Sequence, residues 1–155
     1  MSTLEIGDKA PAFSASDDSG AKLSLKDFKG EKFVLYFYPK DDTPGCTKEA
    51  CTFTENLSAF NKLGVKVVGV SKDSVAKHVK FKEKYGLKFP LLSDEDGAIC
   101  EAYGTWIEKS MYGRKYMGID RATFLIDESG KISAVWRKVK VPGHIEEILK
   151  VLKSA

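Results

Sequence analysis

Two hydrophobic patterns alternate along the chain: continuous apolar runs, which suit buried strands, and apolar residues spaced three or four apart, which suit amphipathic helices. The run KFVLYFYP at residues 32–39 is rich in aromatic residues and predicts a central strand covered on both faces. KVVGVS at 66–71 predicts a second buried strand. RATFLID at 121–127 and KISAVWR at 131–137 flank the turn ESG and predict an adjacent pair of strands.

Helical spacing follows the first of these strands. Thr43 can cap a helix, Pro44 suits the first helical position, and apolar residues then recur every three or four positions up to Gly64. A strand therefore leads into a helix through the loop PKDDT. Further helical segments are predicted at residues 74–85, 98–103 and 143–153.

The order of these elements predicts the fold class. Residues 12–16 and 22–25 flank DDSG and predict an N-terminal hairpin. Strands then alternate with helices before the antiparallel pair and the last helix, which argues for a three-layer α/β/α sandwich with a mixed central sheet. This order resembles the thioredoxin fold. Because no repeat, low-complexity tract or linker interrupts it, we expect residues 1–155 to form a single domain.

Composition excludes several functions. Of the 155 residues 30% are charged, and the formal net charge of +3 is too small to argue for a nucleic-acid partner. The N-terminal sequence MSTLEIGDKAPAF has no apolar core of a signal peptide, and no apolar run approaches the roughly 18–20 residues that span a bilayer. We therefore expect a cytoplasmic protein with no membrane partner.

The segment YPKDDTPGCTKEAC, residues 38–51, contains two of the three cysteines. Cys46 falls in the first turn of the predicted helix, where unpaired N–H groups and the helix dipole stabilise a thiolate. A thiolate is nucleophilic, so Cys46 is a candidate catalytic residue, with a buried structural thiol as the alternative. Thr43 could bond the backbone N–H of Cys46 as a cap, or its hydroxyl could face a substrate beside the sulfur.

Pro39, Thr43 and Cys46 spell P-x-x-x-T-x-x-C, which resembles the active-site pattern of the peroxiredoxins. With Cys51 completing C-x-x-x-x-C, the chain is similar to the Q subfamily, also called bacterioferritin comigratory proteins, over essentially its whole length. The stretches GDKAPAF, LSDEDGAICEAYG and GIDRATFLIDESGKI carry the same resemblance.

This resemblance implies a thiol-dependent peroxidase with the thioredoxin fold. Cys46 would attack hydrogen peroxide or an organic hydroperoxide and become a sulfenic acid, with Arg121 as the fourth active-site residue beside Pro39, Thr43 and Cys46. Cys51 would resolve the sulfenic acid as an intramolecular Cys46–Cys51 disulfide, which thioredoxin or a similar dithiol would reduce. The resemblance implies no cofactor and no metal, and it suggests a monomer or a weak homodimer.

The spacing of the two thiols conflicts with a disulfide in an intact helix. Five residues of α-helix separate two Cα atoms by about 8.6 Å, from a rise of about 7.5 Å and a rotation of about 140°. A disulfide usually needs Cα atoms within about 6.8 Å. We therefore expect the first turns of this helix to unwind during each catalytic cycle.

Three rival functions fit the sequence less well. A metal site built from Cys46 and Cys51 with His78 or His144 lacks the paired spacing of zinc ligands, and we expect both histidines at the surface. A thioredoxin-type oxidoreductase needs C-x-x-C. A binding module based on the lysine-rich residues 76–88 is weakened by the absence of arginine there.

Two further features stay open. Cys100, in GAICEAYG, has the setting of a small buried apolar side chain, so we expect a structural role. Residues 104–118 are expected to be irregular, and their apolar side chains could cover the active site, receive a partner or pack in the core. Those side chains are Trp106, Ile107, Met111, Tyr112, Tyr116 and Met117.

Overall fold

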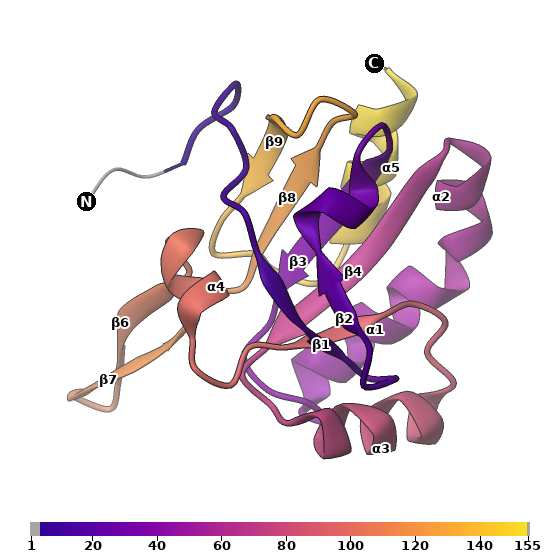
Figure 1. Cartoon of the computed structure of the whole chain (residues 1–155). Helices are drawn as coiled ribbons and strands as arrows, with labels where there is room; N and C mark the ends of the chain where they lie inside the picture. The colour runs from indigo at the N-terminus through magenta and orange to yellow at the C-terminus, as the bar shows by residue number, and fades with distance from the viewer. Residues whose placement is uncertain (1–3, 155) are drawn as a thin grey trace.

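The computed structural model describes residues 4–154, which are built around one mixed β-sheet (Figure 1). Its strands are β1 (Ser14–Asp17), β2 (Lys22–Ser24), β3 (Lys32–Phe37), β4 (Val65–Ser71), β5 (Leu91–Ser93), β8 (Ala122–Ile126) and β9 (Ile132–Trp136). They lie side by side in the order β2-β1-β5-β4-β3-β8-β9. Strands β3, β4 and β5 are parallel, whereas β8 and β1 run antiparallel to their neighbours β3 and β5.

The apolar runs of the sequence form the centre of this sheet. In β3 every residue after Lys32 is buried, and in β4 every residue except Lys66 is buried, because helices or loops cover both faces. The predicted N-terminal hairpin is present as β1 and β2. The predicted pair at 121–127 and 131–137 is present as β8 and β9.

Helices cover the two faces of the sheet unequally. The helices are α1 (Pro44–Glu55), α2 (Leu57–Lys62), α3 (Val75–Tyr85), α4 (Ala98–Ala102) and α5 (His144–Lys153), with a 3₁₀ helix η1 (Leu25–Phe28). Side chains of α1, α2, α3 and α5 share one core cluster with the sheet, whereas α4, η1 and the segment around Phe13 contribute to a second cluster. The prediction of a three-layer sandwich with a mixed sheet is confirmed. None of the helices in the described range is long and apolar enough to cross a membrane.

Three local predictions differ from the structure. The helix predicted from residue 43 to Gly64 is interrupted at Asn56, which separates α1 from α2. The strand β5 was not predicted, because three residues are too few to show a period. Residues 104–118 are not irregular.

That segment forms a β-hairpin of β6 (Trp106–Met111) and β7 (Arg114–Ile119), which projects from the body of the molecule (Figure 1). Tyr112 and Gly113 at its tip both have positive φ angles, 52° and 78°. A tight hairpin turn that follows the twist of its strands requires two residues with positive φ angles. A tyrosine is an uncommon residue for that conformation, so the turn was not recognised in the sequence.

Candidate active site

Cys46 lies where the sequence predicted, in the first turn of α1. The helix begins at Pro44, and Thr43 before it has an extended backbone (φ −100°, ψ 154°). Only 1% of Cys46 is exposed, and its side chain belongs to the core cluster between α1 and the sheet. The sulfur is thus both at a helix N-terminus and shielded from bulk water.

Arg121, directly before β8, reaches this cysteine from 75 residues away in the sequence. Its Nη2 donates to Cys46 Sγ at 3.4 Å, and its Nη1 donates to Glu49 Oε1 at 2.6 Å. A Cβ atom at Gly45 would lie 3.1 Å from Nη2, so the glycine gives the guanidinium room beside the sulfur. The structure therefore brings together Cys46 and Arg121 as the sequence analysis expected.

Glu49 is a member of this cluster that the sequence analysis missed. Its side chain is fully buried and pairs with Arg121. Burial raises the pKa of Glu49 to about 7, although the charge and hydrogen bond of Arg121 act to lower it. Glu49 follows Cys46 by three positions, and residues with this spacing lie on the same face of a helix. This spacing is the feature of the sequence that could have identified Glu49.

Thr43 and Pro39 lie in the loop that joins β3 to α1. The Thr43 hydroxyl donates to the backbone oxygen of Lys40 at 2.8 Å and makes no capping hydrogen bond. The capping role considered for Thr43 is therefore wrong, and its oxygen can still accept a hydrogen bond. Pro39 is exposed just after β3.

Cys51 lies on the same unbroken helix as Cys46. Both thiols are free, and Cys51 is partly buried against the core. Burial, followed by the charge of Glu55, raises the pKa of the Cys51 thiol. Helical geometry keeps the two Cα atoms about 8.6 Å apart, beyond the usual reach of a disulfide.

Both histidines are buried, so the prediction that they lie at the surface is wrong. His78 is 0% exposed and His144 is 4% exposed. His78 contacts Asp41 and the carbonyl oxygen of Leu92. His144 Nε2 lies 2.8 Å from the Thr123 hydroxyl, and burial lowers the pKa of His144 to about 4. Polar partners from distant segments permit this burial.

The described part of the chain contains one cluster with the ligand types of a metal site, Asp41, Asp73 and His78. Their ligand atoms lie within 4.8 Å of one another. These groups already bond to one another or to nearby hydroxyl and backbone groups. The cluster includes neither Cys46 nor Cys51, so the thiols are not arranged as metal ligands.

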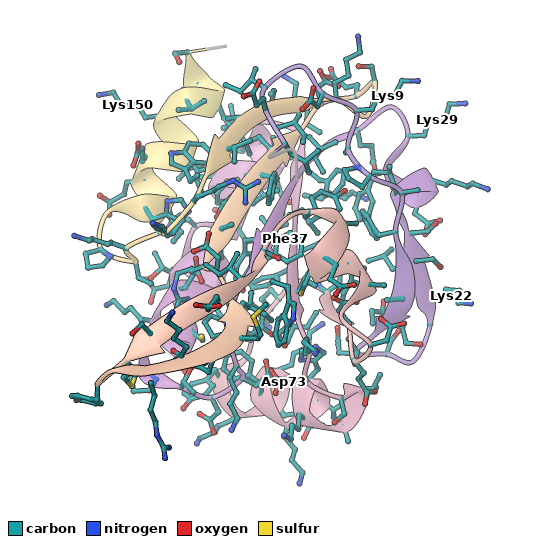
Figure 2. All side chains as sticks on the ribbon, turned by 90° about the vertical axis from the view of Figure 1, so that its left-hand side faces the viewer. Lys9, Lys22, Lys29, Phe37, Asp73 and Lys150 are labelled. Atoms are coloured by element: carbon teal, nitrogen blue, oxygen red, sulfur yellow. The ribbon has the colours of Figure 1, made fainter. Side chains whose placement is uncertain are left out.

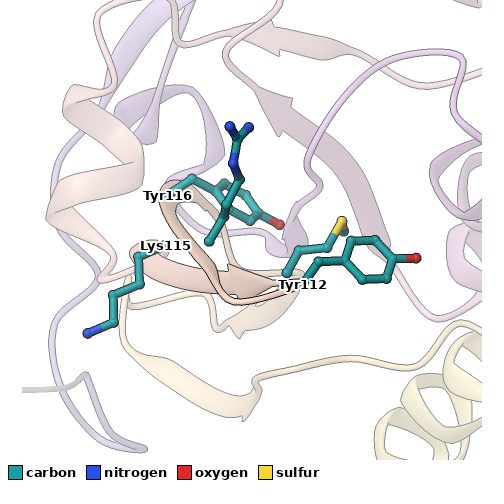
Figure 3. A pocket seen from close by; sticks show the side chains of 5 residues that line it. Tyr112, Lys115 and Tyr116 are labelled. Carbon is teal, nitrogen blue, oxygen red and sulfur yellow. The ribbon is translucent and has the colours of Figure 1, made fainter.

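The β6–β7 hairpin lies beside the active site at its base and carries exposed apolar side chains at its end. Strand β7 ends at Ile119, two residues before Arg121, which places the base of the hairpin next to that arginine. Burial lowers the pKa of Lys109 on β6. Tyr112 is 99% exposed, so core packing does not explain the tip. A shallow pocket of about 560 Å³ is formed there by Met111, Tyr112, Arg114, Lys115 and Tyr116 (Figure 3).

Comparison with known proteins gives consistent matches over most of the chain. Residues 6–135 match the AhpC/TSA family. The chain is 58% identical over 147 residues to a putative peroxiredoxin bcp of Coxiella burnetii, covering 95% of this chain and 97% of the relative.

Solved structures extend the likeness to three dimensions. Xylella fastidiosa PrxQ superposes with a TM-score of 0.94 at 41% identity, covering 99% of this chain and 98% of that one. A Xanthomonas campestris bacterioferritin comigratory protein, studied for its alkyl peroxide reduction activity, superposes with a TM-score of 0.90 at 43% identity, covering 99% and 98%.

Proposed function

Because the chain belongs to the AhpC/TSA family and is a peroxiredoxin of the Bcp or Q type, we propose that Cys46 is the residue with which it reduces peroxides. Members of this group are thiol-dependent peroxidases, and this chain is one of them. Its substrate is a peroxide, and its reductant is a thiol.

One observation carries the assignment: the buried sulfur of Cys46 accepts a hydrogen bond from Arg121 at 3.4 Å. A guanidinium at this distance stabilises the thiolate over the thiol, because it favours the charged form of the sulfur. A buried cysteine without such a cation would be protonated and inert. Arg121 is therefore the residue that makes burial of Cys46 compatible with catalysis.

The first chemical step is attack of the Cys46 thiolate on the terminal oxygen of the peroxide. The sulfur–oxygen bond forms as the oxygen–oxygen bond breaks, and the leaving oxygen takes a proton and departs as water or an alcohol. Cys46 is thereby oxidised to a sulfenic acid. The donors of Arg121 stabilise the negative charge that develops on the peroxide oxygens.

Thr43 and Pro39 orient the substrate in this proposal. The Thr43 hydroxyl donates its hydrogen bond to the backbone oxygen of Lys40. Its own oxygen is therefore free to accept a hydrogen bond from the peroxide O–H. Pro39 restricts the backbone as the chain leaves β3 toward the helix. Neither role requires a cofactor or a metal.

The second step uses Cys51. Its thiol condenses with the sulfenic acid to give the Cys46–Cys51 disulfide and water, and the two sulfurs meet only if the first turns of α1 unwind. Amide hydrogen exchange on the reduced and oxidised forms tests this motion. We expect residues 46–51 to lose protection on oxidation, and equal protection in both forms would contradict the motion.

Thioredoxin or a similar dithiol protein completes the cycle by reducing this disulfide. A Cys51→Ser variant is expected to form the sulfenic acid normally but to lose turnover supported by thioredoxin. Unchanged turnover in this variant would mean that another thiol resolves Cys46. The proposed location is the cytoplasm, where the three free thiols would stay reduced.

The assignment of Cys46 is tested by peroxide consumption coupled to thioredoxin, with hydrogen peroxide and an organic hydroperoxide as substrates. The Cys46→Ser variant should show no activity, because a serine hydroxyl is not ionised at pH 7. Cys100→Ser provides the matched control, since it removes the other buried thiol and should keep its activity. Activity that survives in Cys46→Ser would exclude Cys46 as the nucleophile.

A further inference from the structure

The loop between β3 and α1 is held to the rest of the molecule by a buried network around Asp41. The Tyr38 hydroxyl donates to Asp41 Oδ1 at 2.5 Å, and the backbone N–H of Asp41 donates to Asp73 Oδ2 at 2.8 Å. His78 on α3 places its Nδ1 2.6 Å from Asp41 Oδ2. Asp73, labelled in Figure 2, follows β4, so three separate elements meet at Asp41.

Both ring nitrogens of His78 face oxygen atoms that accept hydrogen bonds. Nδ1 faces the Asp41 carboxylate, and Nε2 lies 2.8 Å from the carbonyl oxygen of Leu92 on β5. A neutral imidazole carries a single N–H and could satisfy only one of them. The doubly protonated imidazolium satisfies both, and its charge is balanced by Asp41.

The charges around the His78 ring also favour its doubly protonated state. Burial acts to lower the pKa of His78, but the hydrogen bond and charge of Asp41, the Leu92 carbonyl and the charge of Asp73 together raise it above its ordinary value. Tyr38, the residue after β3, faces Asp41 as a hydroxyl donor. Four lysines also line the adjoining pocket of about 340 Å³, and they are exposed to solvent whereas Asp41 and Asp73 are buried: Lys40, Lys77, Lys80 and Lys84.

The loop has a second attachment to α3 that is weaker. Asp42 accepts from Lys84 Nζ at 2.8 Å and from the Tyr85 hydroxyl at 2.6 Å. This pair is exposed to solvent, and exposed ion pairs contribute little to stability. The buried pair of Asp41 and His78 is therefore the main attachment of the loop.

We propose that Asp41 and His78 are positioning residues for the peroxidase reaction: their ion pair holds the loop before α1 so that Cys46 stays in contact with Arg121. Asp41 lies five positions before Cys46, and the loop ends at the residue before the helix. The same pair keeps the loop in place while residues 46–51 unwind for disulfide formation. This inference rests on the proposed function of Cys46.

The charge state of His78 can be measured without peroxidase activity. The chain has two histidines, so ¹⁵N-histidine labelling gives two assignable rings by NMR. At pH 7 both nitrogens of His78 should be protonated, whereas His144, whose pKa is about 4, should be neutral. A neutral His78 at pH 7 would overturn the proposal even if Cys46 proves to be the nucleophile.

Kinetics test whether the pair positions the nucleophile. We expect His78→Asn and Asp41→Asn to lower kcat/KM for peroxide about ten- to hundredfold near pH 6.5, because small displacements of a reacting atom cost that much. Asp94→Asn is the matched control, since Asp94 is also a buried carboxylate, accepting two backbone N–H groups at the start of α4. Equal losses in Asp41→Asn and Asp94→Asn would mean only general destabilisation and would overturn the proposal.

The pH dependence of kcat/KM shows whether His78 acts through its charge or through its shape. Above its folded pKa, His78 in the wild type loses the proton that His78→Asn never carries. The ratio of wild-type to variant kcat/KM should therefore fall as pH rises from 6 to 10. A ratio that stays constant over this range would show that the ring acts by its shape alone, and the proposal would fail.

Discussion

Cys46 and Cys100 are buried to the same degree, at 1% and 0% exposure, but the nearest charges are of opposite sign. Cys46 contacts the guanidinium of Arg121. Cys100 lies beside Asp94, whose carboxylate accepts its backbone N–H at 2.8 Å. Burial, reinforced by Asp94, raises the pKa of the Cys100 thiol far above its ordinary value. The structural role expected for Cys100 agrees with these surroundings.

The contrast shows that two equally buried cysteines can lie beside opposite charges. Each of the two thiols has a buried carboxylate nearby, Glu49 in one case and Asp94 in the other. At Cys46 the arginine bonds to both the sulfur and the carboxylate. At Cys100 the negative charge of Asp94 acts on the thiol and favours its protonated form.

Removing the arginine should make the two sites alike, and this change has the largest expected effect. For Arg121→Met we expect kcat/KM for peroxide to fall about 10²- to 10³-fold, the typical loss when one charge-stabilising donor is removed. Alkylation of Cys46 by iodoacetamide at pH 7 should also slow toward the rate of Cys100, measured by mass spectrometry.

Arg137→Met is the control for that experiment. Arg137 donates to the carbonyl oxygens of Gly104 and Tyr103, and no bond from it to either cysteine is formed. Its loss should affect stability rather than the reaction of Cys46. Equal kinetic losses in the two variants would mean that the contact between Arg121 and Cys46 does not explain the difference between the two cysteines.

The buried carboxylate of Glu49, which pairs with Arg121, should make stability depend on pH. Glu49 has a folded pKa of about 7 against an ordinary value of 4.5, so the folded protein holds this proton more tightly than the unfolded chain. Its contribution to stability is therefore present below pH 4.5 and is lost as the pH rises through 7. Arg121 does not fully offset the cost of burying this charge.

Urea denaturation of the wild type and Glu49→Gln between pH 4 and 8 measures this contribution. The difference in free energy of unfolding, wild type minus variant, should fall by about 3 kcal/mol over this range, at about 1.4 kcal/mol per pKa unit. A difference that does not depend on pH would mean that Glu49 is ionised throughout and fully paired.

The third prediction has the smallest effect and concerns Cys100. Cys100→Ala leaves a cavity of about one sulfur atom, which should lower the free energy of unfolding by about 1 kcal/mol. Peroxidase activity should not change, because Asp94 disfavours the thiolate there. Loss of activity with folding intact would show that Cys100 takes part in the reaction.

Much of the fold was predictable because hydrophobic periodicity is a local property. The runs that became β3 and β4, and the helix start at Pro44, can be identified within a few residues of sequence. The β6–β7 hairpin was missed because its turn uses Tyr112 at a positive φ angle. The three residues of β5 are too short for any pattern.

The residues of the proposed active site were also predictable only where they form a local pattern. Pro39, Thr43 and Cys46 lie within eight positions and form one motif, and the resemblance that this motif carries also pointed to Arg121. Glu49 was overlooked, although its spacing from Cys46 suits one helix face. The burial of His78 was unpredictable, since its partner Asp41 is 37 positions away.

By itself, the sequence determined the order of strands and helices and placed one cysteine at the start of a helix, because both follow from patterns along a short stretch of chain. Only the tertiary structure decided which charges lie beside Cys46 and beside His78. Arg121 reaches Cys46 across 75 positions, and Asp41 reaches His78 across 37, whereas Asp94 lies only six positions before Cys100. Charges act through space at close range, so the packing of a distant segment sets the surroundings of Cys46, whereas those of Cys100 come from its own stretch of chain.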